Sequence, residues 1–379
     1  MDNVTHTLVG LTLARTRLGR AGRGTTAALV LASSAPDIDI VTLAGGGSAY
    51  LHWHRGPTHG PLGIVGLGIV TAALVWLGRR LFDKRATDSP APFVQLALVS
   101  MIGVLVHVLM DIPTSYGIRV LSPFSWHWYA EDWMPIVDIY LIAVLAAGLF
   151  FGRGSEAARR QNVKLALALM LVDYAVRGVA HHEAILLAPR AFGPTLPASC
   201  DGTRASSAPF EHWPLPPPAP PQDGAHRCLI ELAAMPDFLS PFSWDLIAQT
   251  SNSYETFEVD LLDARYRQAP GRGEVLWRHT VRYPNVWTPA ALEAARAPTA
   301  NLFLGFSRFP LVRASVDSAG MATVRWTDMR FAAGRGGQPP AAAAARGRDG
   351  GIAASAGSLF AVTVRLGANG RVLGETFGR

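Results

Sequence analysis

Long apolar stretches separated by short polar loops dominate the first half of the sequence. Five of them approach the length of about 20 residues that a helix needs to cross a bilayer, and they cover roughly residues 25–44, 61–78, 94–112, 134–151 and 163–188. An earlier stretch, Val4 to Ala14, is too short to span alone and lacks the features of a signal peptide. The pattern predicts an α-helical membrane bundle of about five spans plus a short N-terminal helix, over residues 1–190.

The second half has a different pattern. Residues 191–227 are rich in proline, which predicts a stiff, extended linker. After the linker, apolar and polar positions partly alternate in runs rich in Val, Phe, Tyr and Trp, as expected for half-buried sheet. The runs are Cys228 to Met235, Trp244 to Arg267, Val275 to Tyr283, Ala300 to Phe331 and Leu359 to Phe377. We therefore expect a mainly β extramembrane domain over residues 228–379.

Composition and charge support a membrane protein and set its orientation. Hydrophobic residues make up 49% of the chain and charged residues only 16%, which is apolar for a soluble protein of this length. Short cytoplasmic loops collect Lys and Arg, and the basic clusters at residues 15–23, 79–85 and 153–164 share one predicted side. Five crossings then place the C-terminal domain in the periplasm. The net charge of +6 is explained by this topology, and the basic residues are not interleaved with aromatics as a nucleic-acid interface requires.

Imidazole and carboxylate groups gather at the predicted outer ends of the helices. An ionisable side chain inside a membrane span costs roughly 2.5–3.5 kcal/mol on insertion scales, so spans that keep one usually keep it for function. Several such groups without a cation would leave buried charges unpaired. The alternative is that each is a hydrogen-bonded residue between helices. We predict a metal site with the ligands His6, Asp37, Asp39, His54, His59, His107 and Asp111.

Local spacing gives each pair a reason to converge. His107 and Asp111 are four residues apart and share one face of a helix. Asp37 and Asp39 follow a proline that interrupts the helix, and a Gly-Pro turn separates His54 from His59. Nitrogen and oxygen donors together suit Zn, Fe or Mn better than Ca or Mg. We expect a divalent metal, Zn as the first choice, with one to three ions.

If the site is catalytic, its mechanism follows from metal chemistry. A bound cation lowers the pKa of a water molecule toward about 7 and stabilises a phosphate ester. Asp39 is the candidate general base, as the spare carboxylate of its pair. Arg55 is the candidate phosphate clamp, with contact to lipid headgroups as the equal alternative. A site at the bilayer surface favours a lipid or lipid-linked substrate that arrives by lateral diffusion.

Other polar residues in the helical region have a structural role, or are either structural residues or members of the site. Asp173 and Arg177 are four apart, which predicts a structural ion pair. Asp138 is either a member of the site or a carboxylate at a helix N-terminus, where the helix dipole favours it. The group at residues 181–183 either joins the site or lies at the membrane interface.

Four motifs carry a resemblance to a known family. They are THTLVG at residues 5–10, APDID at 35–39, HRGPTH at 54–59 and HVLMDIPTSYGIRVLSPFSW at 107–126. In this order they resemble the bacterial inner-membrane metal-dependent hydrolases, a family also described as LexA-binding, inner-membrane-associated hydrolases. The resemblance covers about residues 1–150. It implies a helical domain in the bacterial inner membrane and hydrolase activity, with no defined substrate.

A more distant similarity concerns the order of the candidate ligands. An N-terminal His, an Asp, a further His and then H-x-x-x-D is similar to the zinc-cluster layout of phospholipase C and P1 nuclease, which cleave phosphate esters. The likeness implies as ligands His6, an Asp of the 37/39 pair, His54 or His59, His107 and Asp111. Those enzymes carry further ligands after the H-x-x-x-D. Here only His127, Asp132, Asp138 or residues 181–183 are available for that part.

The two cysteines, Cys200 and Cys228, flank the proline-rich segment. In an oxidising periplasm they would form a disulfide that closes a loop of about 28 residues, worth about 3 kcal/mol; free thiols are the equal alternative. Nothing in the β-rich domain has a catalytic pattern, because its aspartates are scattered. We expect this domain to cover the membrane site or to bind a protein partner.

These observations lead to one preferred function and two alternatives. The preferred function is a multi-pass, metal-dependent phosphoesterase of the inner membrane that acts on lipids or lipid-linked esters. The first alternative is a regulatory or scaffolding membrane protein with a structural metal, which the LexA-binding description favours. The second is a transporter, for which the sequence lacks the internal repeats that such folds show.

Overall fold

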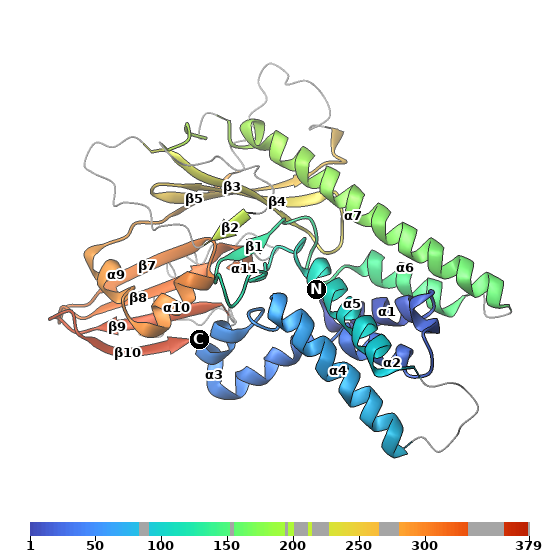
Figure 1. Ribbon diagram of the computed structural model, residues 1–379. Coiled ribbons are helices and arrows are strands. Elements are labelled where there is room, and N and C mark those ends of the chain that lie inside the picture. Colours follow the sequence, from blue (N-terminus) through green and yellow to red (C-terminus); the bar gives the residue numbers. More distant parts are fainter. Residues whose placement is uncertain are drawn as a thin grey trace.

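The computed structural model describes residues 1–82, 91–151, 155–193, 196–200, 211–213, 227–264, 280–332 and 360–377. Figure 1 shows a group of helices on one side of the molecule and two β-sheets on the other, with one long helix, α7, running along both. Chain segments near the N-terminus, the middle and the C-terminus meet where the two parts join. The helical first half and the mainly β second half agree with the sequence-based prediction.

The first part contains nine helical elements in the described residues. α1 begins at its N-cap Asp2, whose side chain accepts hydrogen bonds from the backbone N–H groups of Val4 and Thr5. Pro36 opens a 3-10 helix, η2, directly after α2, so the chain bends by 48° instead of continuing one helix. The elements are α1 (Asn3–Ala14), η1 (Leu18–Arg20), α2 (Thr25–Ala32), η2 (Pro36–Gly45), α3 (Gly46–Trp53), α4 (Pro61–Phe82), α5 (Phe93–Asp111), α6 (Ile139–Phe150) and α7 (Glu156–Phe192).

Two of the described helices, α4 and α5, are long and apolar enough to cross a membrane. A third span exists if the bent pair formed by α2 and η2–α3 counts as one. α6 is apolar but has only 12 residues. α7 is long enough but carries charges such as Lys164, Asp173 and Arg177 along its length. The expected membrane-type helices are therefore present, whereas a count of about five spans is not confirmed.

The second part consists of two antiparallel four-stranded sheets. One has the order β3-β4-β5-β6 and the other β10-β9-β8-β7. Their strands are β3 (Leu229–Pro236), β4 (Ser243–Thr250), β5 (Ser253–Asp260), β6 (Val281–Pro284), β7 (Pro310–Val316), β8 (Ala322–Asp328), β9 (Ala361–Leu366) and β10 (Val372–Phe377). Along β8, side chains alternate between buried and half-buried positions, so this strand presents one face to the core.

Short helices interrupt the strand order that the sequence predicted. α9 (Pro289–Ala294) and α10 (Pro298–Phe306) cover the β7–β10 sheet, and α11 (Met329–Ala332) follows β8. The expected strand-like run from Ala300 therefore begins as helix, because Phe303 and Phe306 lie three apart and both face the core. The run from Trp244 contains two strands that turn at residues 251–252. The proline run of the expected linker lies outside the described residues.

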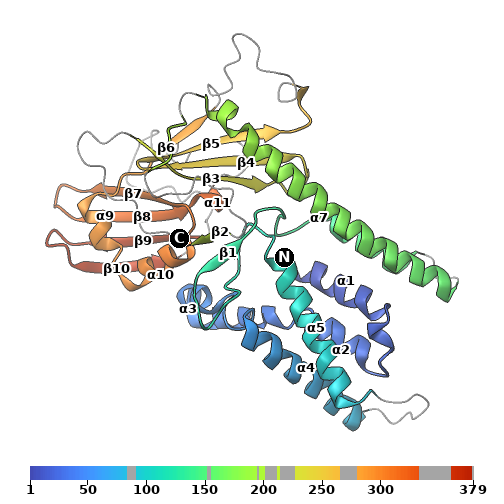
Figure 2. The ribbon, with the colours of Figure 1, turned by 45° about the horizontal axis from the view of Figure 1, so that its top comes forward.

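The core of the C-terminal sheet includes side chains from the helical part. Leu51 and Tyr116 belong to the same buried cluster as the inward residues of β7, β8 and β9. β1 (Trp128–Ala130) pairs with β2 (Glu211–Trp213), and the rings of Trp128 and Trp213 stack within this cluster. The two parts thus share one hydrophobic core, as the close approach of β1, β2 and the C-terminal sheet in Figure 2 illustrates.

Helix α7 connects the two parts on another side. Its Ala180, Ala184 and Ala188 pack against the β3–β5 face, where small side chains allow close approach. Arg177 forms an ion pair with Asp138, at 2.5 Å between Nε and Oδ2, and a longer one of 3.9 Å with Asp173. The predicted pairing with Asp173 is thus the weaker of two. Asp138 is also the N-cap of α6, which agrees with the helix-terminus interpretation of this residue.

Cys200 and Cys228 form a disulfide. The sequence had left a disulfide and two free thiols as equal alternatives. The disulfide joins the segment after α7 to the start of β3, where the backbone N–H of Cys200 donates to the carbonyl of Leu229. The disulfide therefore fixes the beginning of the β3–β6 sheet to the segment at residues 196–200.

A buried arginine at the junction provides a stability test. Arg308 donates to Asp132 Oδ2 at 2.6 Å and to Glu231 Oε1 at 2.7 Å, and all three residues are buried. Arg308→Ala leaves two buried carboxylates without this partner, so we expect a loss of about 3–5 kcal/mol in the free energy of unfolding. Thermal unfolding of the purified protein measures it. The matched control is Arg296→Ala, which breaks an exposed pair with Glu293 and should cost at most about 1 kcal/mol. Equal effects of the two variants would contradict the junction as described.

Candidate metal centre

The candidate site lies where three segments meet at one end of the helical part. η2 supplies Asp37, the loop before α4 supplies His59, and the last two turns of α5 supply His107 and Asp111. One ligand atom from each of these four residues lies within 4.8 Å of the others. His59, His107 and Asp111 have fully buried side chains, and that of Asp37 is 15% exposed.

The contacts within this four-residue group are close. His59 Nε2 and His107 Nε2 are 3.3 Å apart. Asp111 Oδ2 lies 3.5 Å from each of these nitrogens. Asp37 Oδ1 is 3.6 Å from His107 Nε2 and 3.9 Å from His59 Nε2. Two imidazole nitrogens and two carboxylate oxygens therefore surround one small volume, a donor set typical of Zn and related transition metals.

Hydrogen bonds to Nδ1 set the ring orientation of His59 and His107 and leave Nε2 toward the group. His107 Nδ1 lies 2.7 Å from the carbonyl oxygen of Ser33, which only accepts, so Nδ1 carries the proton. Thr58 Oγ1 donates to Asp39 Oδ2 at 3.1 Å and therefore accepts from His59 Nδ1 at 2.9 Å. Both Nε2 atoms are then unprotonated in the neutral rings. Such bonding of the distal nitrogen is the usual support of metal-binding histidines.

Two ring nitrogens that face one another in this way favour a positive charge between or beside them, either a proton on one ring or a metal ion. Their lone pairs repel at 3.3 Å, and the surroundings are buried, so water does not screen the repulsion. Asp111 Oδ2 adds a buried carboxylate oxygen without a hydrogen bond. A proton would satisfy one nitrogen, whereas a divalent metal ion satisfies all four donors together. The residues present therefore fit a metal ion.

The geometry of η2 separates the two aspartates that the sequence treated as a pair. A 3-10 helix has about three residues per turn, so side chains two positions apart diverge by about 120° around its axis. Asp37 lies beside His107, while Asp39 accepts from the backbone N–H of Arg55 at 2.8 Å and contacts His54 Nδ1 at 2.9 Å. Asp39 therefore lies behind the four-residue group, where it orients the HRGPTH loop. Both oxygens of Asp39 already accept hydrogen bonds or contact His54. This arrangement differs from the predicted roles of Asp39 as a metal ligand and a general base.

His54 and His6 also lie outside the four-residue group. His54 is held by Asp39 and stacks on Tyr50. His6 stacks on His107 with ring centroids 3.7 Å apart, and its Nε2 lies 3.3 Å from Asp111 Oδ1. Burial lowers the pKa of both His6 and His54, against the opposing effect of their carboxylate partners. His6 thus directly contacts the four-residue group, whereas His54 contacts Asp39, which lies behind the group.

Arg55 contacts the group from the side of the C-terminal sheet. It adopts a left-handed conformation with φ of 50°, which lets the chain turn between His54 and His59. Its NH2 lies 3.4 Å from Asp111 Oδ2, and its NH1 donates to Thr114 Oγ1 and to the carbonyl of Gly117. The guanidinium lies 4.7 Å from the centre of the Tyr116 ring. The cation is therefore fixed beside the buried carboxylate.

The C-terminal domain in turn holds the segment that carries Arg55. Arg330 donates to the carbonyls of Ser115 and Tyr116 and is paired with Asp328. Phe306, Phe331 and Phe360 pack around the Tyr116 ring. The sequence did not indicate Tyr116 or Arg330, because they act only through contacts between distant segments. Thr58 lies inside the HRGPTH motif and could have been considered from its position between two histidines.

Other candidate residues have separate partners. Asp132 binds Arg308, His181 packs edge-on against Trp244, and His127 is exposed beside Ser125. The structure thus does not bring these additional ligands, which a zinc-phospholipase-like layout would need, into the four-residue group.

Comparison with known proteins agrees with the placement in a membrane. The model of a family described as YdjM inner membrane protein matches residues 1–184, a part that includes all four residues of the group. YfhP of Bacillus subtilis (strain 168), described as an uncharacterized protein, is 28% identical over 184 residues, which are 46% of this chain and 52% of YfhP. The chain thus spans about half the length of this relative. No solved structure matches. The family resemblance predicted from the sequence is confirmed for the N-terminal part.

The hydrogen bond behind His59 provides a test of the metal centre. Thr58→Val removes the hydroxyl between His59 Nδ1 and Asp39 but leaves all four donors in place. Loss of such support should weaken metal affinity by about 10- to 100-fold, measured by competition of the purified protein with a zinc indicator. Thr71→Val, a buried threonine in α4, is the matched control and should bind as the wild type does. Unchanged affinity in Thr58→Val would contradict the assignment of His59 as a ligand.

Proposed function

We propose that this protein is a metal-dependent hydrolase of the inner membrane that cleaves phosphoric esters of lipids or lipid-linked compounds. The single observation that carries the proposal is the convergence of the four residues, in which the Nε2 atoms of His59 and His107 face each other at 3.3 Å beside Asp111. Asp37, His59, His107 and Asp111 would hold one divalent ion, for which Zn is our first choice. Such an ion would lower the pKa of a water molecule toward about 7 and offset the charge of a phosphate.

A substrate would reach the four-residue group from the side of Asp37. Among the four residues, Asp37 has the side chain that is partly exposed, at 15%. A substrate that approaches there meets the Asp37 carboxylate first and has His59 and His107 behind it. Asp39 keeps the HRGPTH loop in place through Arg55 and Thr58, so its role in this proposal is to position the ligands.

Arg55 would stabilise a phosphate next to the group. It is a buried cation 3.4 Å from Asp111, and its planar guanidinium suits the oxygens of a phosphate better than an ammonium does. Thr114, Gly117 and Tyr116 fix its orientation before any substrate arrives. A positive charge held in a low-dielectric site contributes more to the stabilisation of a developing anion than a mobile surface residue does.

Exposed apolar side chains beside the group support a lipid substrate. Ile38, Ile40, Val41 and Leu43 on η2 are each more than half exposed and lie on the same short element as Asp37. Such a surface is favourable against lipid and unfavourable in water. Trp53 and Trp126 contact each other nearby and are both exposed, as aromatic residues at a membrane interface commonly are. Lateral diffusion would bring a lipid ester to Asp37.

The periplasmic side is our proposal for this end of the molecule. The disulfide between Cys200 and Cys228 favours an oxidising compartment for the C-terminal domain. Arg79 and Arg80 in the last turn of α4 lie at the opposite end of that helix from His59 and favour a cytoplasmic location for that end.

A structural metal in a regulatory or scaffolding protein is the second candidate. The observation that favours it is the burial of three of the four residues, because structural sites are closed and catalytic sites keep an open position. In that case the ion would stabilise the meeting point of η2, α4 and α5. The β-rich domain would then serve a protein partner.

An activity assay separates the two candidates. The purified protein, with and without Zn, is incubated with bis(p-nitrophenyl) phosphate and with phosphatidylglycerol vesicles. We expect metal-dependent turnover that a chelator abolishes and that falls at least about 100-fold in His107→Ala. His127→Ala, an exposed histidine, should keep wild-type activity. Stoichiometric metal without turnover on either substrate would reject the hydrolase and favour the structural site.

Substitution of Arg55 tests its role apart from metal binding. Arg55→Lys keeps the positive charge but removes the planar fork, so kcat/KM should fall about 10- to 100-fold. Metal affinity should change little, because Arg55 is not among the four donors. A parallel loss of metal affinity and activity would show instead that Arg55 only maintains the fold of the site.

A further inference from the structure

A groove lies away from the four-residue group, between α7 and the ends of strands in the β3–β6 sheet. It encloses about 900 Å³, toward the upper end of the roughly 300–1,000 Å³ that small-molecule sites occupy. Nine of its ten lining residues are apolar. On α7 it is lined by Val172, Ala175, Val176, Val179, Ala180, Glu183 and Leu187, and on the sheet side by Phe242, Leu261 and Leu262.

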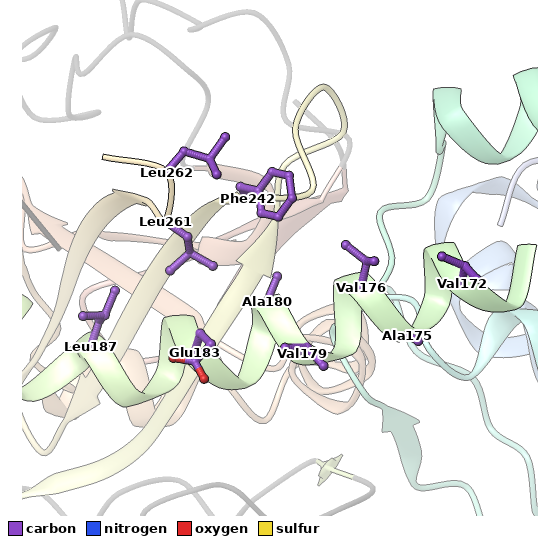
Figure 3. Close-up of a pocket in the computed structure, with 10 residues that line it drawn as sticks. All are labelled: Val172, Ala175, Val176, Val179, Ala180, Glu183, Leu187, Phe242, Leu261 and Leu262. Atoms are coloured by element: carbon purple, nitrogen blue, oxygen red, sulfur yellow. The ribbon is translucent and has the colours of Figure 1, made fainter. Parts of the chain in front are cut away.

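The shape of this groove follows from the helix. Figure 3 shows Val172, Val176, Ala180 and Leu187 on the side of α7 that faces the three sheet residues. The lining on α7 runs from Val172 to Leu187, a rise of about 22 Å at 1.5 Å per residue. The hydrocarbon part of one bilayer leaflet is about 15 Å thick, half of the whole core. The groove is therefore long enough for an extended acyl chain.

The groove continues an apolar stripe that begins beside the other helices. Leu165 and Leu169 are exposed and precede Val172, Val176 and Val179 at spacings of three or four residues, so all five lie on one side of α7. The lower part of this helix packs along α6, whose residues are almost all apolar. An acyl chain could move from the surface beside α6 into the groove without passing a polar barrier.

The single ionisable group lies toward the far end of the groove. Glu183 is exposed and stands 11 residues, or about 16 Å, along α7 from Val172. A lipid would thus have its tail at Val172, nearer the helical part, and its headgroup toward Glu183. Phe238 and Leu239, on the loop before β4, are also about half exposed, and the hydroxyl of Tyr140 on α6 donates to the carbonyl of Leu239. This loop therefore lies against the helical part.

We propose that the groove between α7 and the β3–β6 sheet binds one acyl chain of a phospholipid from the outer leaflet. The bound chain would fill the junction between the helical part and the C-terminal domain and so hold the domain against the membrane. The proposal rests on the membrane placement of the proposed function but not on hydrolysis or on metal. Its ligand is a structural lipid, distinct from a substrate at Asp37.

Lipid retention tests the proposal. The protein is reconstituted in nanodiscs of phosphatidylethanolamine and phosphatidylglycerol, extracted into detergent and examined by native mass spectrometry without added metal. Val176→Trp fills the groove, whereas Leu165→Trp places the same side chain on the same stripe below it. We expect one retained phospholipid per chain in the wild type and in Leu165→Trp, and at least a 5-fold lower occupancy in Val176→Trp. Equal retention in the two variants, or no retained lipid in the wild type, would overturn the proposal.

A second measurement uses the wild-type protein alone. Phosphatidylcholine with a diazirine near the end of one acyl chain is incorporated in the nanodiscs and activated by light. We expect labelled peptides that contain Phe242 or residues 261–262, because these residues line the groove on the sheet side. Labelling confined to α4 and α5, or a chain dimer seated on the groove in place of lipid, would contradict the assignment. Lipid retention without phosphoesterase activity would reject the proposed hydrolysis alone.

Discussion

Burial of ionisable groups is the constraint on which the arrangement of the helical part depends. Asp111 is fully buried. Its carboxylate contacts Arg55, His6 and the Met1 amino group on one side and faces His59 and His107 on the other. Each of these groups would be unfavourable if buried alone. When they are buried together, the attraction between the carboxylate and the cationic groups offsets part of that cost. A backbone group, the carbonyl of Ser33, supports His107, and a side chain, the hydroxyl of Thr58, supports His59.

The C-terminal domain extends this support beyond the helices. Arg330 fixes the backbone of Ser115 and Tyr116, and the Tyr116 ring carries the guanidinium of Arg55. A continuous set of contacts therefore leads from the sheet to Asp111. Movement of the domain by a small amount would alter the position of Arg55 before it altered the four donors, because those donors belong to η2, α5 and the loop before α4. The C-terminal domain and the Arg55 charge beside the four-residue group are thereby connected through Tyr116.

The sequence predicts those parts of the site that depend on local geometry. His107 and Asp111 could be paired because four-residue spacing on a helix is independent of the rest of the fold. The choice of Asp37 over Asp39, and of His59 over His54, could not be made in this way. It depends on the 3-10 geometry of η2 and on the left-handed turn at Arg55, and neither leaves a clear trace in the residue pattern. The number of membrane spans was harder still to predict. α7 is apolar on one stripe but charged elsewhere, and it continues past the helical part onto the sheet.

The extent of the family match bears on the role of the second domain. Residues 1–184 include the four donors and Arg55, and they end within α7 just as it begins to pack on the sheet. The contacts that hold Tyr116, from Phe306, Arg330 and Phe360, come from residues beyond the match. The matched part therefore contains all four donors, whereas the contacts that hold Tyr116 against Arg55 come from the sequence that follows it.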